Sequence, residues 1–172
     1  MTTHVTTECS QHAQQIRSMT QFLLGAVKDD LTPQQAVFQL PHSKTHILWI
    51  VGHITTGLDF MVSILIDRKP LLPESQNMRF FIGSVPSADA ADFPSIQEMI
   101  GNLVRVTNEV AAHLEAQDDR VLDQLIPEAL PFHMLGPTVR EFLAKGDFHT
   151  GYHTGQVTLL RSAQGLAAGY GV

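Results

Sequence analysis

The sequence is poor in several residues that mark particular classes of protein. It has a single cysteine, Cys9, which excludes an internal disulfide and favours a reducing compartment. Charged residues make up only 16% of the 172 residues, and the 11 basic ones are scattered along the chain and outnumbered by 17 acidic ones. Because the basic residues form no cluster, a nucleic-acid partner is not expected.

Signals for membranes and export are also missing. No uninterrupted apolar run approaches the ~20 residues that cross a bilayer. The opening residues, MTTHVTTECSQH, have neither the basic start nor the apolar stretch of a secretory signal peptide. These absences predict a cytoplasmic protein without a membrane partner. The length and the 44% hydrophobic content predict a single domain, residues 1–172, with its own core.

The pattern of apolar residues indicates helices throughout. Alternation of period two persists nowhere, whereas apolar residues recur at spacings of three and four. Ser95 and Glu98 have the spacing of a capping box, with Pro94 expected at the first helical position. Thr138 and Glu141 repeat that spacing. The resulting helices are expected at about 7–27, 43–66, 94–117 and 138–164.

The second predicted helix, apolar on more than half of its circumference, is expected to be buried. A long segment, 67–93, joins it to the third helix, although a hairpin between antiparallel helices needs only a few residues. A helix of ~22 residues is ~33 Å long, and the segment can cover that distance. The sequence therefore predicts an all-α fold, a four-helix bundle whose long crossover leaves helices two and three parallel. In the crossover, Phe80, Phe81 and Ile82 either form an exposed patch for a dimer or pack back on the bundle.

Nine histidines are present, and three lie at inward positions of predicted helices. His149 and His153 are four residues apart, so they project from one face of the last helix. His53 lies on an apolar stripe of the buried second helix. Burying neutral imidazoles without partners costs a few kcal/mol, and three of them could bind one divalent ion with an open position. The alternative interpretations are surface histidines of a weak helix, as most helical pairs at this spacing are, or histidines that only pack in the core.

Glycines interrupt both helices that carry these histidines. Gly57 lies one turn after His53, and Gly151 and Gly155 flank His153. Each glycine costs roughly 1 kcal/mol in a helix interior relative to alanine. The expected compensation is close backbone approach or room for a ligand, and Gly146 extends the series.

Other residues of the same types are expected to be structural. His42 and His46 are also four apart, but they straddle a helix start. His46 is seven residues from His53, or ~10 Å along a helix axis, too far to share its ion easily. Cys9 occupies an apolar helical position and is expected to be a packing thiol. The remaining histidines are expected to be solvated or structural: His4, His12, His113 and His133.

The segment from His149 to Gln156, HTGYHTGQ, resembles the terminal motif of the DinB/YfiT-like superfamily. The preceding GPTVREFLAKGDF and the second-helix WIVGH, which ends at His53, are similar to that family as well, so the resemblance spans nearly the whole chain. It implies a four-helix bundle, often a homodimer, with His53, His149 and His153 as metal ligands and Gln156 beside them. Thr154 stands where many relatives have arginine, and Tyr152 where another histidine is common, so contacts to a substrate are expected to differ.

The resemblance also implies a chemistry. Relatives include transferases that use low-molecular-weight bacterial thiols and a mycothiol-dependent maleylpyruvate isomerase. The implied function is a metal-dependent enzyme that activates a small-molecule thiol or water, of the thiol S-transferase, isomerase or hydrolase type. Three imidazoles accept zinc, nickel, copper or iron alike.

The competing hypothesis is a non-catalytic metal-binding protein, for stress response or interaction, whose ion stabilises the fold. A fourth protein ligand, for example His12, would favour it. Asp147, Tyr152 and Gln156 are the nearest polar candidates for orienting a ligand or substrate. For Asp147, a solvated helix position is the competing interpretation.

Overall fold

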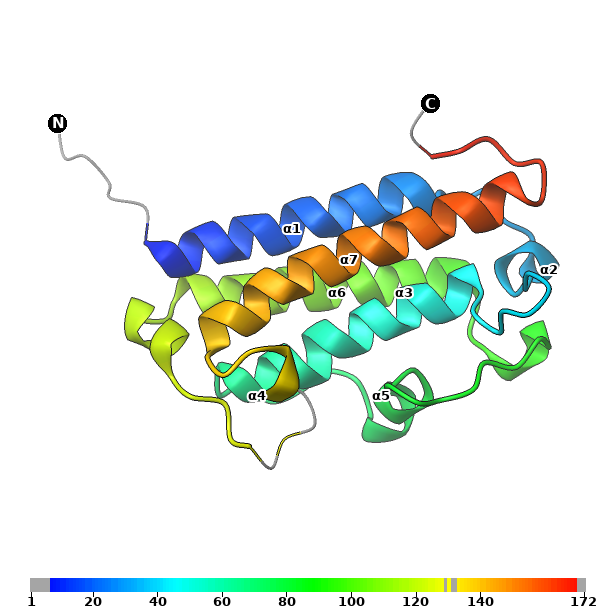
Figure 1. The fold of residues 1–172 in the computed structure, drawn as a ribbon. Coiled ribbons are helices and arrows are strands. Elements are labelled where there is room, and N and C mark those ends of the chain that lie inside the picture. The colour runs from blue at the N-terminus through cyan, green and yellow to red at the C-terminus, as the bar shows by residue number, and fades with distance from the viewer. Residues whose placement is uncertain (1–6, 129, 131–132, 170–172) are drawn as a thin grey trace, which may run out of the picture.

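The computed structural model describes residues 7–128, 130 and 133–169 (Figure 1). Its long helical segments lie side by side, and α1 packs against both α6 and α7, as does α3. The described residues contain no β-strand, only an isolated bridge between Leu125 and Thr138, so the all-α prediction is confirmed. The helices are α1 (Glu8–Val27), α2 (Pro33–Ala36), α3 (Ile47–Thr56), α4 (Ser63–Leu65), α5 (Glu74–Arg79), α6 (Ile96–Glu115) and α7 (Val139–Ser162).

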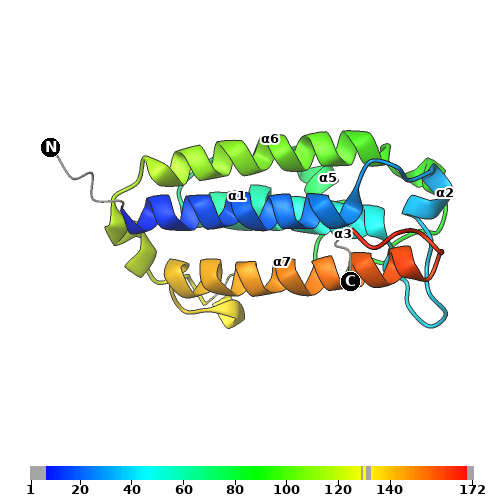
Figure 2. The ribbon, with the colours of Figure 1, turned by 90° about the horizontal axis from the view of Figure 1, so that it is seen from above.

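The helices run in two directions. The chain colours show α1 and α7 running one way, and α3 and α6 the other (Figures 1 and 2). The connection from α4 to α6 carries α5, which packs against α3. It also carries a short 3-10 helix, Ala90–Asp92.

Polar side chains begin each long helix. Ser95 is the N-cap of α6 and accepts the N–H of Glu98 at 3.1 Å. Pro94 therefore lies before the helix. The prediction that it occupies the first helical position was wrong. Thr138 and Glu141 form a complete capping box at the start of α7, as predicted. The second predicted helix begins later than expected, because the side chain of His46 caps α3.

The second predicted helix is also not continuous. Its middle is a π-helical segment, Gly57–Val62, which the apolar spacing did not indicate. Asp59 in this segment is fully buried, and its carboxylate accepts the N–H groups of Leu71 and Leu72 at 2.8 and 2.9 Å. The side-chain amide of Asn77 donates to the same carboxylate. These bonds satisfy a buried charge that would otherwise be costly, and they fasten the start of the crossover to the helix.

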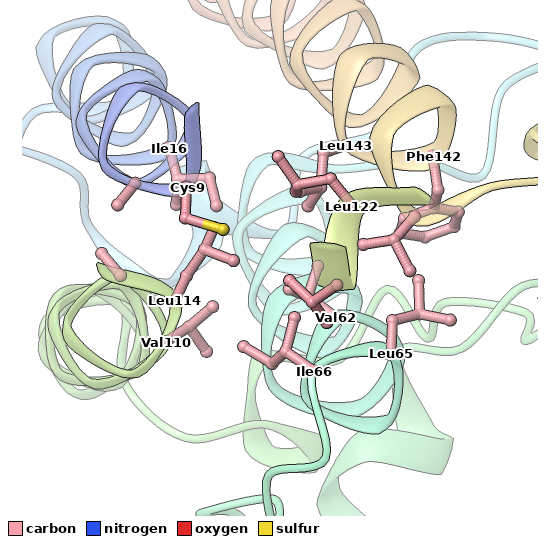
Figure 3. Close-up of a cluster of buried hydrophobic side chains, with 14 of the residues drawn as sticks. Cys9, Ile16, Val62, Leu65, Ile66, Val110, Leu114, Leu122, Phe142 and Leu143 are labelled. Carbon is pink, nitrogen blue, oxygen red and sulfur yellow. The ribbon is translucent and has the colours of Figure 1, made fainter. Parts of the chain in front are cut away.

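The core divides into two hydrophobic clusters along the helices. The first lies around the start of α1, where Cys9, Val110 and Leu114 pack together (Figure 3). The second lies around the other end and includes Leu23, Ile50, Met99, Leu103 and Val157. Between them the buried hydroxyls of Thr20 and Thr107 lie 3.0 Å apart. This pair of hydroxyls is a polar contact between α1 and α6 within the core.

Cys9 is fully buried in the first cluster, as expected of a packing thiol. Burial, and then the neighbouring Asp119, raise the pKa of the Cys9 thiol to about 11. The thiol is therefore protonated at neutral pH and not nucleophilic.

The segment Ile47–Leu65 is long and apolar enough to cross a membrane by length and composition. The sequence did not predict this segment, because its apolar residues do not form one uninterrupted run. Most of the segment is buried inside the protein, where α3 packs against α6 and α7. Its composition therefore agrees with the buried position predicted for the second helix.

The aromatic residues of the crossover pack inward. Phe80 is 1% exposed, with its ring centroid 6.0 Å from that of Phe93. Phe81 packs edge-on against Phe60. Only Ile82 of the predicted patch is exposed, at 57%. Of the two alternatives, packing back on the helices is the one observed for the phenylalanines, and a dimer interface stays a prediction.

Candidate metal centre

Three histidines from two helices meet at one place in the structure. His53 comes from α3, and His149 and His153 come from α7. His53 and His153 are buried, with 8% and 7% exposure, whereas His149 is exposed to solvent. The structure thus brings together the three histidines singled out in the sequence, and whether they bind a metal stays a prediction.

The distances between the ring nitrogens suit a shared ion. The Nε2 atom of His149 lies 3.0 Å from Nε2 of His153 and 3.3 Å from Nε2 of His53. A tetrahedral zinc ion with Zn–N bonds of about 2.0–2.1 Å separates its nitrogen ligands by about 3.3 Å. All three donor atoms lie within 4.8 Å of one another, so the rings must move closer together to bind one ion.

Hydrogen bonds on the outer side orient two of the rings. Nδ1–H of His53 donates to the carbonyl of Phe80 at 2.8 Å, and Nδ1–H of His153 donates to Oε1 of Gln156 at 2.7 Å. Because both partners are oxygen acceptors, Nδ1 carries the proton and the Nε2 lone pair faces the cluster. Lone pairs that converge in this way repel each other unless a cation or a shared proton lies between them.

The surroundings keep the rings neutral. Loss of hydration around the ring, followed by repulsion from neighbouring imidazoles, lowers the pKa of the buried His153 to about 4, and does the same for His149, whose ring nitrogens lie against the other histidines while the rest of its side chain is exposed. Burial also lowers the pKa of His53, and the bond to the Phe80 carbonyl opposes that shift. Neutral imidazole is the form that binds metal, so the site is ready for an ion at neutral pH.

Two contacts fix His53 further. Trp49 stacks on its ring with centroids 4.6 Å apart and planes 9° apart, and the Trp49 indole N–H donates to Ser84. Gly52 allows Phe80 to come close, because a Cβ at residue 52 would lie 2.4 Å from the Phe80 ring. The sequence interpretation missed Phe80 and Gly52. A glycine directly before His53 in the most buried helix was the signal that could have found the close approach.

The other predicted site residues lie around the cluster. Gln156 bonds His153, and its amide N–H donates to the hydroxyl of Tyr152 at 3.1 Å. Asp147 is half-buried, and loss of hydration raises its pKa to about 6. Partial burial fits a position on the wall of the cavity, and the role of Asp147 stays a prediction. Within the described part of the chain, neither His12 nor any carboxylate joins the three histidines.

The glycines near the histidines differ in whether they line a cavity. Gly57 and Gly146 line an apolar cavity beside His53 and His149, and a Cβ on either would meet open space. Gly151 would meet only the end of Met19 at 3.7 Å, and Gly155 faces open space. The expectation of close backbone approach at these positions was wrong. The expectation of room for a ligand agrees with the structure at Gly57 and Gly146.

The second histidine pair does not form a site. His46 is fully buried with both ring nitrogens bonded, and His42 is exposed with a φ of 69° at the preceding turn. The spacing of four therefore has no structural meaning there.

Comparison with known proteins gives one result. The model of the DinB superfamily matches residues 12–157, a span that contains all three clustered histidines. No curated protein matches the chain.

Proposed function

The chain belongs to the DinB superfamily, and we propose that it is an enzyme whose His53, His149 and His153 bind one divalent metal ion. The observation that carries this proposal is the convergence of three Nε2 atoms, two of them on rings oriented through Nδ1–H. When bound there, a divalent ion lowers the pKa of a thiol or water in its open position, so that thiolate or hydroxide forms near neutral pH. Zinc, nickel, copper and iron all suit imidazole ligands.

The number of ligands favours an enzyme over a structural site. Structural zinc sites are closed by four protein ligands, whereas catalytic sites keep one position open. Among the described residues the cluster has three candidate ligands. His149 is exposed to solvent, which gives a small molecule a route to the open position.

The remaining residues hold the site in place and line a cavity beside it. Phe80 and Gln156 keep Nε2 of His53 and His153 turned inward. An apolar cavity borders the site beside His53 and His149. Asp147 on its wall could accept a hydrogen bond from a substrate.

The scaffold that we propose is the DinB-type four-helix bundle with a long crossover between its second and third helices. The packing of α1 and α3 against α6 and α7, and the path from α4 to α6, support it. We further propose a cytoplasmic homodimer that acts on a small molecule, such as a low-molecular-weight thiol, and binds neither nucleic acid nor membrane. The acidic balance of 17 to 11 supports the absence of a nucleic-acid partner.

The test is the metal content of tag-free protein by plasma mass spectrometry, after exposure to several divalent metals. We expect near one ion per chain in the wild type and loss of the ion in His53→Ala and His153→Ala. His46→Asn on the same helix is the matched control and should keep the ion. Folded wild-type protein that binds no ion would contradict the proposal.

A further inference from the structure

The cavity beside the histidines is apolar and small. It lies between α1, α3 and α7, has a volume of about 100 Å³, and is bordered by His53 and His149 on one side. Ile16, Val62, Phe142 and Leu143 on its wall come from three different parts of the chain (Figure 3). Any molecule that reaches the open position of a metal at the histidines lies next to this cavity.

Most polar groups on the wall are already bonded within the protein. The hydroxyl of Thr20 pairs with that of Thr107, and the hydroxyl of Thr150 donates to the carbonyl of Gly146. Apart from the histidine nitrogens, the wall therefore offers a ligand the carboxylate of Asp147 and, at the rim, the exposed Lys145. An apolar group is what the remaining surface can bind.

The local backbone creates this space. Gly57, Leu58 and Val62 reach the wall from the π-helical segment, a type of distortion often found at functional sites. Gly57 and Gly146 leave open space where a side chain would stand. Met19 on the opposite wall is flexible and can adapt to different shapes.

The rim shows where a ligand enters. Ile82 is 57% exposed and Leu135 37% exposed, and both line the cavity. His149 is exposed beside them. The cavity is thus reached from the same side as the histidine cluster.

On the basis of the metal site proposed above, we propose that this cavity selects ligands that carry a small apolar group next to a metal-binding head. A cavity of 150 Å³ lined by apolar side chains holds benzene, so about 100 Å³ with an open rim accommodates a single ring or a short branched chain. The substrate class is therefore a small molecule with an oxygen, nitrogen or sulfur ligand atom attached to such a group. The head binds at the histidines and the apolar group lies between Ile54, Leu58 and Phe142.

The test compares two hydroxamates on zinc-loaded protein by calorimetry. Acetohydroxamate offers the metal-binding head with a methyl group, and benzohydroxamate offers the same head with a ring. Burial of the ring should make benzohydroxamate bind about 10- to 100-fold more tightly. Gly146→Leu, which fills the cavity, should reduce this ratio to near one and leave the affinity for acetohydroxamate unchanged.

Gly155→Leu is the matched control, because it makes the same substitution on the same helix at an exposed position that does not line the cavity. It should keep the wild-type ratio. A ratio near one in the wild type, or a ratio unaffected by Gly146→Leu, would overturn the cavity proposal while leaving the metal site intact.

A measurement without metal separates the two proposals. Toluene added to metal-free protein should shift the methyl NMR signals of Ile54, Leu58 and Leu143 in the wild type and in Gly155→Leu, but not in Gly146→Leu. If zinc does not bind and toluene gives these shifts, the metal site fails and the apolar cavity stands. If toluene leaves these methyl signals unchanged in all three proteins, the cavity proposal fails.

Discussion

His46 and His53 are two buried histidines of α3, one at its N-cap and one within it. They differ in the hydrogen-bond partners of their ring nitrogens. Nδ1 of His46 accepts the N–H of Trp49, and its Nε2–H donates to the carbonyl of Ser87. His53 uses Nδ1–H for the carbonyl of Phe80, whereas its Nε2 faces His149. His46 therefore has both nitrogens bonded to the protein backbone, and His53 has one nitrogen left for a ligand.

This difference shows that burial alone does not distinguish a candidate metal ligand from a structural histidine. Burial lowers the pKa of both imidazoles, although His46 caps α3 and His53 lies within it. A histidine closed by two backbone groups stabilises a helix start. A histidine held by one backbone group, whose other nitrogen lies 3.3 Å from a further imidazole nitrogen, has the arrangement expected of a metal ligand.

Metal-linked stability should separate the two histidines most strongly. An ion that binds only the folded state at about 1,000 times its Kd stabilises it by about 4 kcal/mol. We expect thermal unfolding of the wild type and of His46→Asn to shift upward on addition of zinc, and that of His53→Ala to stay unchanged. An equal shift in all three proteins would mean that zinc binds elsewhere.

The pH dependence of stability should identify His46 as a buried neutral group. Its pKa of about 4 in the folded protein lies below the unfolded value of about 6.5. The unfolded state binds more protons between these values, so this contribution is present above pH 6.5 and is lost as the pH falls towards 4. His46→Asn keeps a capping side chain and removes the titration. As the pH falls from 6.5 towards 4, the difference in free energy of unfolding between wild type and variant should shrink by up to about 1.4 kcal/mol per pH unit. Denaturant unfolding at several pH values measures it, and a constant difference would contradict the assignment.

Gly52→Ala should displace Phe80 and so weaken its hydrogen bond to His53. The new Cβ would lie 2.4 Å from the buried ring of Phe80, whose carbonyl orients His53. We expect a loss of about 1–3 kcal/mol in the free energy of unfolding, together with weaker zinc binding. Gly101→Ala on α6, where a Cβ meets open space, is the control and should not destabilise. Equal stability of the two variants would show that Phe80 moves away freely.

Gln156→Ala should have the smallest effect. It removes the acceptor for Nδ1–H of His153, and loss of such a partner weakens metal binding about tenfold or more. We expect the low end, because Gln156 is partly exposed and water can replace its oxygen. Gln164→Ala, just beyond the end of α7 and bonded to the carbonyls of Gln35 and Leu160, should leave the zinc affinity unchanged. Competition with a chromophoric chelator measures both affinities.

The sequence predicted the features that depend on local spacing. Helix positions, the capping box of α7 and the inward face shared by His149 and His153 all follow from residues a few positions apart. The π-helical segment was not predictable, because it depends on contacts of Asp59 with Leu71, Leu72 and Asn77 beyond the helix. The same limit applies to the bond between His53 and Phe80, residues 27 positions apart. A hydrogen-bond partner such as the Phe80 carbonyl depends on how the crossover packs against α3, which local spacing does not indicate.

The most direct test of the central claim is X-ray absorption spectroscopy of the zinc-loaded protein. The account predicts three imidazole nitrogens at about 2.0–2.1 Å and one further light ligand that exchanges with added small molecules. Four protein ligands would indicate a closed structural site, and fewer than three imidazoles would show that His53, His149 and His153 do not share one ion. Either result would contradict the account.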